Sequence, residues 1–500
     1  MKQRTWENIL KLKETGEIVR MGIPFSTSCK NYFYDAGTGK VVELNVDEKE
    51  IIDSLFDATI SIERASEIIS KLDYSKQFLK SIISENLFAS PILKKFIPLE
   101  YKYQEENMEI QQLIIELTGR CNLRCKYCIY NDYYEGNRNF NTEDITFETA
   151  KKAIDYVYQH RSPERLAITF YGGEPLLNFD VMKQCIDYSL ENLKNCNDLS
   201  FSFTTNLTLM TEEIADYLGK IPNLSIVLSL DGPAEIQNSA RVYSNNKSTF
   251  DDAYRGLKYI SEAAKKYGKL QFIFNSVLMP PYSEEKYNQI NEFFSGLDFL
   301  PENTSVRTSY PCKGSLPQSY YTQDDPITIF EWATSKYLKP GFSNNKQNIY
   351  SVLMETALVK IHNRQIYDEP INCSFYNGCC VPGQRRLYVC TNGLYKVCER
   401  VGNTPYIGHV DQGINIETLK EYYLKQYEQK SIKYCSNCWA FRLCDLCYAD
   451  CYDENGLNIE TKLTYCDGIK DRYKKWLILY HSALENEPKI IEEIDKLEIT

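Results

Sequence analysis

The stretch that decides the fold is residues 113–128, LIIELTGRCNLRCKYC, in which an apolar run leads into three closely spaced cysteines. The run at 113–118 is short and rich in Leu and Ile, as in a strand buried within a parallel sheet. Ligands gather at the carboxyl ends of strands in parallel α/β folds, and the cysteines follow at that end. The sequence therefore predicts a parallel sheet with thiols at the end of its first strand.

Similar apolar runs recur over the next 190 residues or so and alternate with amphipathic helical patterns such as 147–160 and 250–265. We expect six strands, at 113–118, 166–171, 200–205, 225–230, 270–277 and 305–309. Six units are too few for a full eight-stranded barrel. The predicted fold class is therefore α/β, with a partial (β/α)6 barrel at its centre.

Composition and charge limit the classes of partner. The chain has 500 residues, 43% apolar and 25% charged, which excludes fibrous and disordered classes and allows two to four domains. Its net charge of -11 disfavours nucleic acid as a partner. No apolar run approaches the roughly 18 residues needed to cross a bilayer, and the N-terminus lacks an apolar signal core. We expect a cytosolic protein with no membrane partner.

The cysteine count is unusual for that compartment. Eighteen cysteines in a reducing environment favour metal or iron–sulfur ligation over disulfides. With only four histidines and no H-E-x-x-H pair, thiolates must provide most ligands. Three cysteines lie at 121–128 and eleven between 373 and 466; the scattered remainder, which we expect to be small buried hydrophobes, are Cys29, Cys185, Cys196 and Cys312.

The first group, Cys121, Cys125 and Cys128, has the spacing C-x3-C-x2-C. Three thiolates on one tight loop can hold three irons of a [4Fe-4S] cluster and leave the fourth iron open. The alternatives are a zinc site that lacks a fourth ligand, or free thiols.

This spacing, with the aromatic Tyr127 before the last cysteine, resembles the radical S-adenosylmethionine (radical SAM) superfamily. The resemblance implies that Cys121, Cys125 and Cys128 are catalytic, that the open iron binds SAM, and that a 5′-deoxyadenosyl radical is produced. It also implies cofactor contacts at Tyr127 and at residues that follow later strands: Gly172, Gly173, Glu174, Pro175, Thr204, Asn206, Ser229, Asp231 and Arg241.

Among these, Glu174 with the glycine backbone is expected to engage the methionine ammonium of SAM, because a carboxylate accepts charged N–H donors. Thr204, Asn206, Ser229 and Asp231 are expected at the ribose and methionine portions. Arg241 is expected near the SAM carboxylate. The alternative interpretations are ordinary turns and, for Arg241, a solvated surface arginine.

The second group contains two C-x2-C pairs, 435/438 and 444/447, separated by five residues. A zinc ribbon usually needs about 12 to 20 residues between its pairs, so zinc is disfavoured. The spacing resembles the SPASM extension of radical SAM peptide-modifying enzymes, which implies two auxiliary [4Fe-4S] clusters and three clusters in all.

By that resemblance, an inner auxiliary cluster is held by Cys380, Cys398 and Cys447, with Cys373 or Cys379 as its fourth ligand. The outer cluster is held by Cys435, Cys438, Cys444 and Cys466. The sequence departs from the usual pattern in having two residues, not three, between Cys444 and Cys447. Cys390 and Cys451 are additional thiols without an assigned role.

The N-terminal region has a different pattern. A hairpin at 31–44 turns at Gly37-Thr38-Gly39, and helical patterns follow at 47–56, 61–72 and 75–85. Residues 25–56 resemble the recognition element of enzymes that modify ribosomally made peptides, a winged-helix-like module that binds a precursor's leader. A structural cap is the alternative, and acidic helices disfavour DNA binding.

Three domains are therefore predicted: a leader-recognition module at 1–105, a radical SAM partial barrel at 106–345, and a SPASM domain with a C-terminal helix at 346–500. The resemblance implies a peptide maturase that forms cross-links, with cysteine-derived thioethers first and carbon–carbon or carbon–oxygen links behind. Its partners are a precursor peptide and an electron donor such as flavodoxin or ferredoxin. An anaerobic sulfatase-maturing enzyme and a non-catalytic zinc scaffold are the alternatives.

Overall fold

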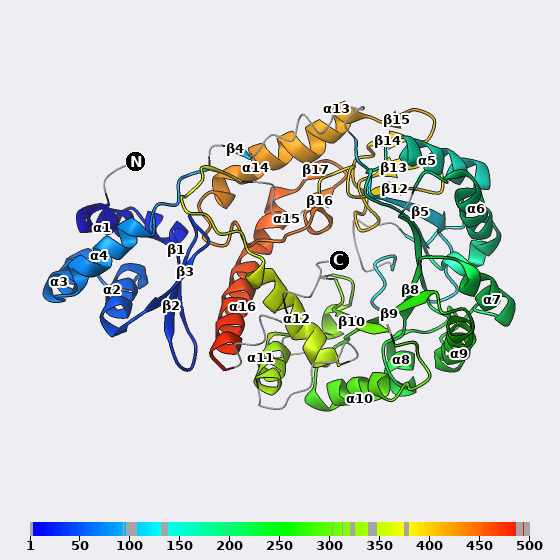
Figure 1. The fold of residues 1–500 in the computed structure, drawn as a ribbon, viewed down its shortest axis with the longest axis horizontal. Helices are drawn as coiled ribbons and strands as arrows, with labels where there is room; N and C mark the ends of the chain where they lie inside the picture. Colours follow the sequence, from blue (N-terminus) through cyan, green and yellow to red (C-terminus); the bar gives the residue numbers. More distant parts are fainter. Residues whose placement is uncertain are drawn as a thin grey trace.

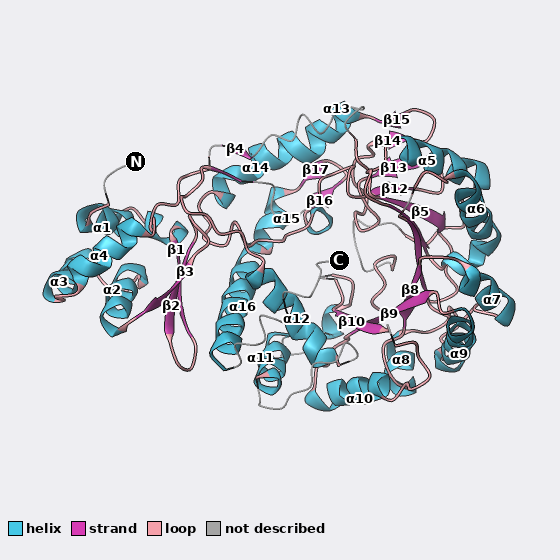
Figure 2. Ribbon diagram, in the orientation of Figure 1, coloured by secondary structure: helices cyan, strands magenta, loops and turns pink. Residues whose placement is uncertain are grey.

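The structure is a computed structural model that describes residues 4–93, 95–96, 108–131, 139–196, 198–302, 304–312, 314–320, 326–338, 348–374, 380–486 and 494. It contains a three-stranded sheet near the N-terminus and a ten-stranded sheet at the other end, with helices between and around them (Figure 2).

The N-terminal part begins with α-helical and 3-10 turns, continues through a small antiparallel sheet in the order β1-β2-β3, and ends with further helices. Its elements are α1 (Trp6–Glu14), η1 (Glu17–Arg20), β1 (Gly22–Ser26), β2 (Asn31–Asp35), β3 (Val41–Leu44), α2 (Val46–Phe56), α3 (Ile62–Lys71) and α4 (Ser75–Ser84). A capping box between Asn45 and Glu48 starts α2, and the Ser61 side chain caps α3. The predicted hairpin is β2–β3, whereas α1 and β1 were not predicted.

This part has its own apolar core, built around Phe33, Ile51, Ile52 and Leu55. Its β1 edge packs against the C-terminal helix α16 (Cys466–Asn486). There the His481 ring lies 4.6 Å from the Tyr32 ring and 5.4 Å from the Phe25 ring. The Tyr32 hydroxyl donates to Glu485 at 2.7 Å.

The central part is a large sheet with the strand order β10-β9-β8-β7-β6-β5-β12-β13-β14-β15. Its chain-order strands are β5 (Gln112–Thr118), β6 (Leu166–Gly172), β7 (Leu199–Thr205), β8 (Leu224–Ser229), β9 (Leu270–Val277) and β10 (Ser305–Ser309), all parallel to their neighbours. They coincide with the six predicted strands to within a residue or so. The six-unit barrel stays a prediction; the structure shows a large, mainly parallel sheet.

Helices follow these strands, as repeated βα units require. They are α5 (Phe147–Gln159), η4 (Pro175–Asn178), α6 (Phe179–Asn192), α7 (Glu212–Lys220), α8 (Ala234–Ala240), α9 (Phe250–Tyr267) and α10 (Glu284–Ser295). Figure 1 shows α5, α6, α7 and α9 along the outer side of the curved sheet.

Strand alternation separates the two faces of this sheet. In β7, Phe201 and Phe203 are buried in the main core, while Ser202 and Thr204 point to the other face and stay partly accessible. On that face the Thr169 and Ser202 hydroxyls hydrogen-bond at 2.7 Å. At β6 and β7 this face of the sheet therefore carries polar, partly accessible side chains.

The C-terminal part extends the same sheet. Strand β12 (Leu387–Val389) pairs in parallel with β5, and antiparallel β13 (Leu394–Lys396), β14 (Gly408–His409) and β15 (Gly413–Ile414) follow. The remaining elements are β4 (Lys95–Phe96), η5 (Gln318–Tyr320), α11 (Pro326–Tyr337), α12 (Ile349–His362), β11 (Cys373–Ser374), α13 (Ile416–Leu419), η6 (Lys420–Lys425), α14 (Gln426–Cys435), η7 (Tyr448–Asp450), β16 (Tyr452–Asp453), β17 (Gly456–Leu457) and α15 (Ile459–Thr464).

None of the helices in the described part of the chain is both long enough and apolar enough to cross a membrane.

Candidate active site

The cysteine loop lies directly after β5, at the carboxyl end of the sheet. The backbone N–H of Arg124 donates to the Val242 carbonyl at 2.7 Å, and that of Lys126 donates to Ala240 at 2.9 Å. The loop is thus fixed against the segment that follows α8, which brings it next to Arg241.

The sulfur atoms of this loop receive backbone hydrogen bonds. The Leu123 N–H lies 3.4 Å from Cys121 Sγ, and the Tyr130 N–H hydrogen-bonds Cys128. Burial nevertheless raises the pKa of Cys121 and of Cys125 to about 12. Thiols in such a setting stay protonated at neutral pH unless a cation compensates the thiolate.

Gly172 and Gly173, at the end of β6, let the backbone there lie very close to the backbone of residues 118–120. A Cβ on Gly173 would lie 2.0 Å from the Arg120 carbonyl oxygen, and Gly172 has φ +131° with Thr118 O only 2.3 Å from its ideal Cβ. The Gly173 N–H donates to that Thr118 carbonyl at 2.9 Å, and the Glu174 N–H donates to Arg120. Only glycine fits there, so this turn lies directly against the start of the cysteine loop. Pro175 then opens η4.

Glu174 is 1% exposed and is held from three directions. Its Oε1 accepts from the Thr205 hydroxyl at 2.9 Å and from the Leu176 N–H at 3.1 Å, while Oε2 accepts from the Asn206 N–H at 2.7 Å. Burial raises the pKa of Glu174 to about 7, against the effect of these hydrogen bonds. A carboxylate has about four acceptor sites, so one remains for a further donor.

A chain of polar side chains joins the end of β7 to the cysteine loop. The Asn206 amide donates to the Asn122 carbonyl oxygen at 2.9 Å, and the Asn122 amide donates to the Thr208 hydroxyl at 2.8 Å. Neither Asn122 nor Thr205 was predicted as a site residue. Thr204, which was, points to the opposite face of β7 from Thr205.

Asp231, Arg241 and Tyr127 meet on the other side of the loop. Arg241 is 6% exposed, so it is not the surface arginine of the alternative interpretation. Its Nε lies 3.1 Å from Asp231 Oδ1, and the Tyr127 hydroxyl donates to Asp231 Oδ2 at 2.6 Å. Ser229 ends β8 two residues before Asp231 and is also buried. Tyr127, Asp231 and Arg241 are therefore brought together beside Cys125.

The sequence assigns most of the C-terminal cysteines to two groups. The outer group is Cys435, Cys438, Cys444 and Cys466, which come from the end of α14, the loop after it and the start of α16. Burial raises the pKa of Cys435 to about 11 and of Cys438 to about 12, and the Cys444 sulfur adds to both shifts. The Ala440 N–H hydrogen-bonds Cys438.

The inner group contains Cys380, Cys398 and Cys447. Burial raises the pKa of Cys398 to about 12, and Cys447 adds to that shift. Burial likewise raises the pKa of Cys447, and Cys380 adds to that shift. Backbone N–H groups hydrogen-bond Cys398 and Cys447, and Arg385 Nη1 lies 3.7 Å from Cys380 Sγ.

The other C-terminal thiols take different places. Cys379 lies outside the described residues, and Cys373 is described only as part of β11, paired with β4. Cys390 belongs to a small apolar cluster with Ile114 and Tyr388. Cys451 is buried beside Cys447, because its thiol donates to the Cys447 carbonyl at 3.3 Å. Burial raises the pKa of Cys451, and Cys447 and Cys444 both add to that shift. Cys312, predicted as an isolated thiol, lies after β10 within range of the Arg400 and Asp450 charges, beside the inner group.

Across the part of the chain that the structure describes, no three Cys, His, Asp or Glu side chains converge closely enough to hold one metal ion. A tetrahedral zinc site needs ligands at about 2.0–2.3 Å from one centre. In an iron–sulfur cluster each cysteine binds a different iron, so its thiols stand further apart.

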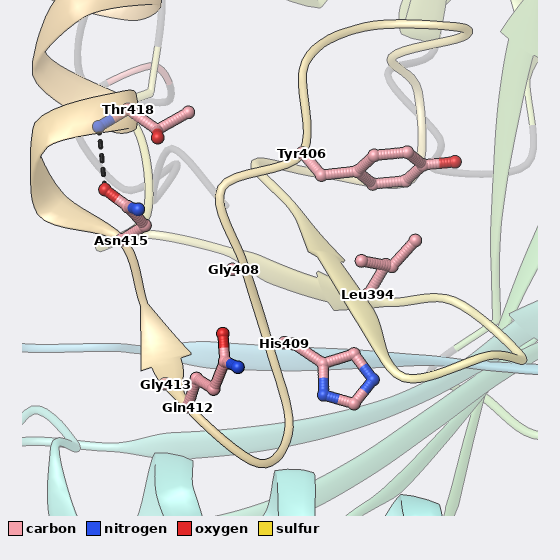
Figure 3. Close-up of a pocket in the computed structure, with 8 residues that line it drawn as sticks. All are labelled: Leu394, Tyr406, Gly408, His409, Gln412, Gly413, Asn415 and Thr418. Carbon is pink, nitrogen blue, oxygen red and sulfur yellow. Dashed lines mark hydrogen bonds between the residues drawn. The ribbon is translucent and has the colours of Figure 1, made fainter.

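A separate pocket of about 330 Å³ lies among β13, β14, β15 and the start of α13 (Figure 3). Tyr406, His409 and Asn415 are among its lining residues, and Figure 3 shows the Asn415 side chain capping the Thr418 N–H. None of the predicted site residues lines it.

Comparisons with known proteins bear on the central part of the chain. Residues 115–294 match the model of the Radical SAM superfamily. An uncharacterized protein of Methanocaldococcus jannaschii is 36% identical over 176 residues, 35% of this chain and 57% of its own length. The cysteine-type anaerobic sulfatase-maturating enzyme of Clostridium novyi is 22% identical over 378 residues, 73% of this chain and 95% of its own length. The chain spans about half the length of the first curated relatives it matches.

Among solved structures, native anSMEcpe with bound AdoMet and Kp18Cys peptide has a TM-score of 0.53 and 19% identity, covering 77% of this chain and 99% of its own. That likeness concerns the fold. The prediction of a radical SAM domain is confirmed, and relatives that share the domain include enzymes.

Proposed function

We propose that the chain is a radical SAM peptide maturase that installs cross-links, first of all cysteine-derived thioethers, in a ribosomally made precursor. The observation that carries this proposal is the loop 121–128 at the carboxyl end of β5, enclosed by Glu174, Asn206 and Arg241 from later strand ends. The Radical SAM match covers these residues.

The residues present fit a [4Fe-4S] cluster at this loop. Three thiols stand on one loop, backbone N–H groups point at two of the sulfurs, and a guanidinium lies beside the third. Hydrogen bonds to sulfur are a usual means of tuning such clusters. Cys121, Cys125 and Cys128 would hold the cluster. When bound, cluster and SAM together supply a 5′-deoxyadenosyl radical that takes a hydrogen atom from the substrate.

The chain's own residues would bind and orient SAM. The remaining acceptor site of Glu174 suits a positively charged N–H donor such as the methionine ammonium. Asn206 hydrogen-bonds both Glu174 and Asn122 of the cysteine loop. These bonds would hold the Glu174 carboxylate at a fixed position relative to the cluster. Thr204 faces the open side of the sheet and Ser229 ends the next strand, where small hydroxyls suit ribose contacts.

The two C-terminal cysteine groups would hold auxiliary clusters in a SPASM domain. A thioether forms when a peptide carbon radical bonds to a cysteine sulfur, with loss of the thiol proton and one electron. The inner and outer groups would accept that electron. A donor protein such as flavodoxin or ferredoxin would deliver the electron that SAM cleavage at the loop 121–128 consumes. Backbone N–H bonds to Cys398, Cys438 and Cys447 repeat the arrangement at Cys121 and support this assignment.

The N-terminal part would bind the precursor's leader. Its β1 edge is covered by α16, whereas β3 pairs only with β2 among the described strands. An unpaired strand edge beside a helix suits an extended peptide. Acidic residues on α2, such as Asp47 and Glu50, favour a leader with basic side chains.

The experiment is anaerobic incubation of the reduced, cluster-loaded protein with SAM and candidate precursors that contain cysteine. We expect 5′-deoxyadenosine and a loss of two hydrogens for each cross-link, read by mass spectrometry of the intact peptide and its fragments. 5′-Deoxyadenosine without any change in cysteine-containing peptides would contradict the cross-linking assignment while leaving the radical SAM chemistry intact.

A second candidate is an anaerobic sulfatase-maturing enzyme, favoured by the match to the Clostridium novyi protein over 95% of its length. Leader dependence separates the two. Val46, 79% exposed at the start of α2 beside the end of β3, is a suitable position for Val46→Glu, and Val19→Glu, 56% exposed on the β1 side, is the matched control. A maturase should lose processing with Val46→Glu alone, whereas a sulfatase-type enzyme that acts on a short peptide should keep it in both variants.

A further inference from the structure

Arg241 is a buried guanidinium next to the cysteine loop. Its side chain is 8% exposed, and arginine is seldom buried unless its charge is paired. Its backbone is held on both sides, because its N–H donates to Gln237 at 2.8 Å and its carbonyl accepts from the Thr249 hydroxyl at 2.8 Å. The start of its side chain therefore has little freedom.

Asp231 pairs with this guanidinium and also accepts hydrogen bonds from two other protein groups. Its Oδ1 accepts from the Val277 N–H at 3.0 Å and lies 3.1 Å from Arg241 Nε, and its Oδ2 accepts from the Tyr127 hydroxyl at 2.6 Å. Its backbone N–H donates to the Gln237 side chain at 2.9 Å. Three protein groups therefore orient this carboxylate.

The rest of the guanidinium faces the cysteine loop. Arg241 Nη1 lies 3.9 Å from Cys125 Sγ, and its Cζ lies 5.3 Å from the centre of the Tyr127 ring. Cys125 and Tyr127 belong to the same loop, so the Asp231–Arg241 pair holds two of its residues at once. A fixed positive charge next to one ligand sulfur favours whichever state of the site carries more negative charge.

We propose that Arg241, fixed by Asp231 and Tyr127, is a positioning residue that raises the reduction potential of the cluster bound at Cys125, independently of SAM. The inference rests on the proposed function, since it concerns a cluster at this loop. Reduction adds one negative charge to the cluster, and the buried guanidinium stabilises that charge more than water-screened surface arginines do. The Tyr127 ring and hydroxyl keep the guanidinium pointed at the sulfur.

The test is an anaerobic redox titration of the full-length, cluster-loaded protein followed by electron paramagnetic resonance in the absence of SAM. The signal of interest is identified as the one that Cys125→Ala removes. Arg241→Gln should lower the midpoint potential of that signal, Arg241→Lys should lower it less, and Tyr127→Phe should give a smaller shift in the same direction. Arg120→Gln is the control, because this arginine precedes the same loop but is 40% exposed and paired with Asp144; its potential should stay near that of the unmodified protein.

The main competing role for Arg241 is binding the SAM carboxylate. If that were its only role, Arg241→Gln would weaken SAM binding and leave the SAM-free potential unchanged, and this result would overturn the inference. Should Arg241→Gln fail to take up iron, Tyr127→Phe decides: an unshifted potential at full iron content overturns the inference as well. An unmodified protein with no signal sensitive to Cys125→Ala would instead overturn the proposed function itself.

Discussion

The two cysteine-rich regions are assembled in opposite ways. The loop 121–128 gathers three thiols within eight residues at the end of one strand, while the C-terminal groups draw their thiols from segments between 380 and 466. Cys444 and Cys447 are three residues apart, yet the sequence assigns them to different groups. Cys444 acts on the pKa of Cys435 and Cys438, and Cys447 acts on that of Cys398. Spacing alone therefore identifies the first site, whereas in the second region the proposed groups interleave along the chain and spacing alone does not separate them.

Removing one thiol from each C-terminal group tests whether these cysteines hold two separate clusters, and it should have the largest effect. We expect Cys444→Ala and Cys447→Ala each to lose about four irons per chain, one cluster, because each variant removes one of the thiolates proposed to hold an auxiliary cluster. Both variants should keep SAM cleavage, since the loop 121–128 is untouched. Iron and sulfide analysis with a 5′-deoxyadenosine assay measures both quantities.

The control for this pair is Cys185→Ala, which removes a fully buried thiol in α6 that lies outside both groups. It should keep the full iron content. If Cys444→Ala and Cys447→Ala removed the same spectroscopic signal, the division into two groups would be wrong.

Glu174→Gln tests the other cysteine-rich region, at the loop 121–128. This variant keeps the shape of the side chain but removes the charge expected to hold the SAM ammonium, so SAM should bind about 30-fold more weakly, as for the loss of a charge-assisted hydrogen bond of about 2 kcal/mol. Equilibrium binding to the cluster-loaded protein measures this. Glu164→Gln, an exposed carboxylate before β6 rather than after it, should bind SAM normally. Equal SAM affinity of Glu174→Gln and Glu164→Gln would show that Glu174 does not bind SAM.

The parts of the fold that the sequence could predict are local ones. The strands β5 to β10 are five to eight residues long, and the cysteine loop follows the first of them directly. Strands β12 to β15 have only two or three residues each, too short for a periodic pattern to show. The antiparallel extension of the sheet was therefore missed.

Sequence patterns missed site residues whose positions depend on strand alternation or on contacts between segments far apart in the chain. Thr204 and Thr205 are adjacent and chemically alike, and only the pleat of β7 decides that Thr205 reaches Glu174. Cys312 is isolated in sequence but lies near Arg400 because β10 ends close to the C-terminal groups. Asp231 was correctly placed near the site, but its hydrogen bonds are made to protein donors, which no spacing could indicate.

The smallest expected effect is a pH dependence of stability that arises in the C-terminal region and not at the loop 121–128. It comes from α16, which starts at Cys466 and carries His481 near its end. Burial lowers the pKa of His481 from 6.5 to about 4, with a further contribution from Arg364. The folded state therefore holds this imidazole neutral, and stability falls as pH drops below 6.5 towards 4, because the unfolded chain binds the proton first. Between pH 7 and pH 5.5 the loss should be about 1 kcal/mol.

Melting temperatures at the two pH values, for the unmodified protein and for His481→Leu, measure this loss. The variant should show a smaller drop on acidification, and His409→Gln, which alters a half-buried imidazole on β14, should behave like the unmodified protein. The same drop in all three proteins would mean that His481 is protonated without cost in the folded state.

The central claim is that the loop 121–128 holds a cluster that cleaves SAM. The most direct measurement is formation of 5′-deoxyadenosine by the reduced, anaerobically loaded protein, compared with Cys125→Ala prepared in the same way. We expect several turnovers of cleavage by the unmodified protein and none above background by the variant, with the C-terminal clusters still present. Equal cleavage by the two proteins, or none by the unmodified protein at full iron and sulfide content, would contradict it.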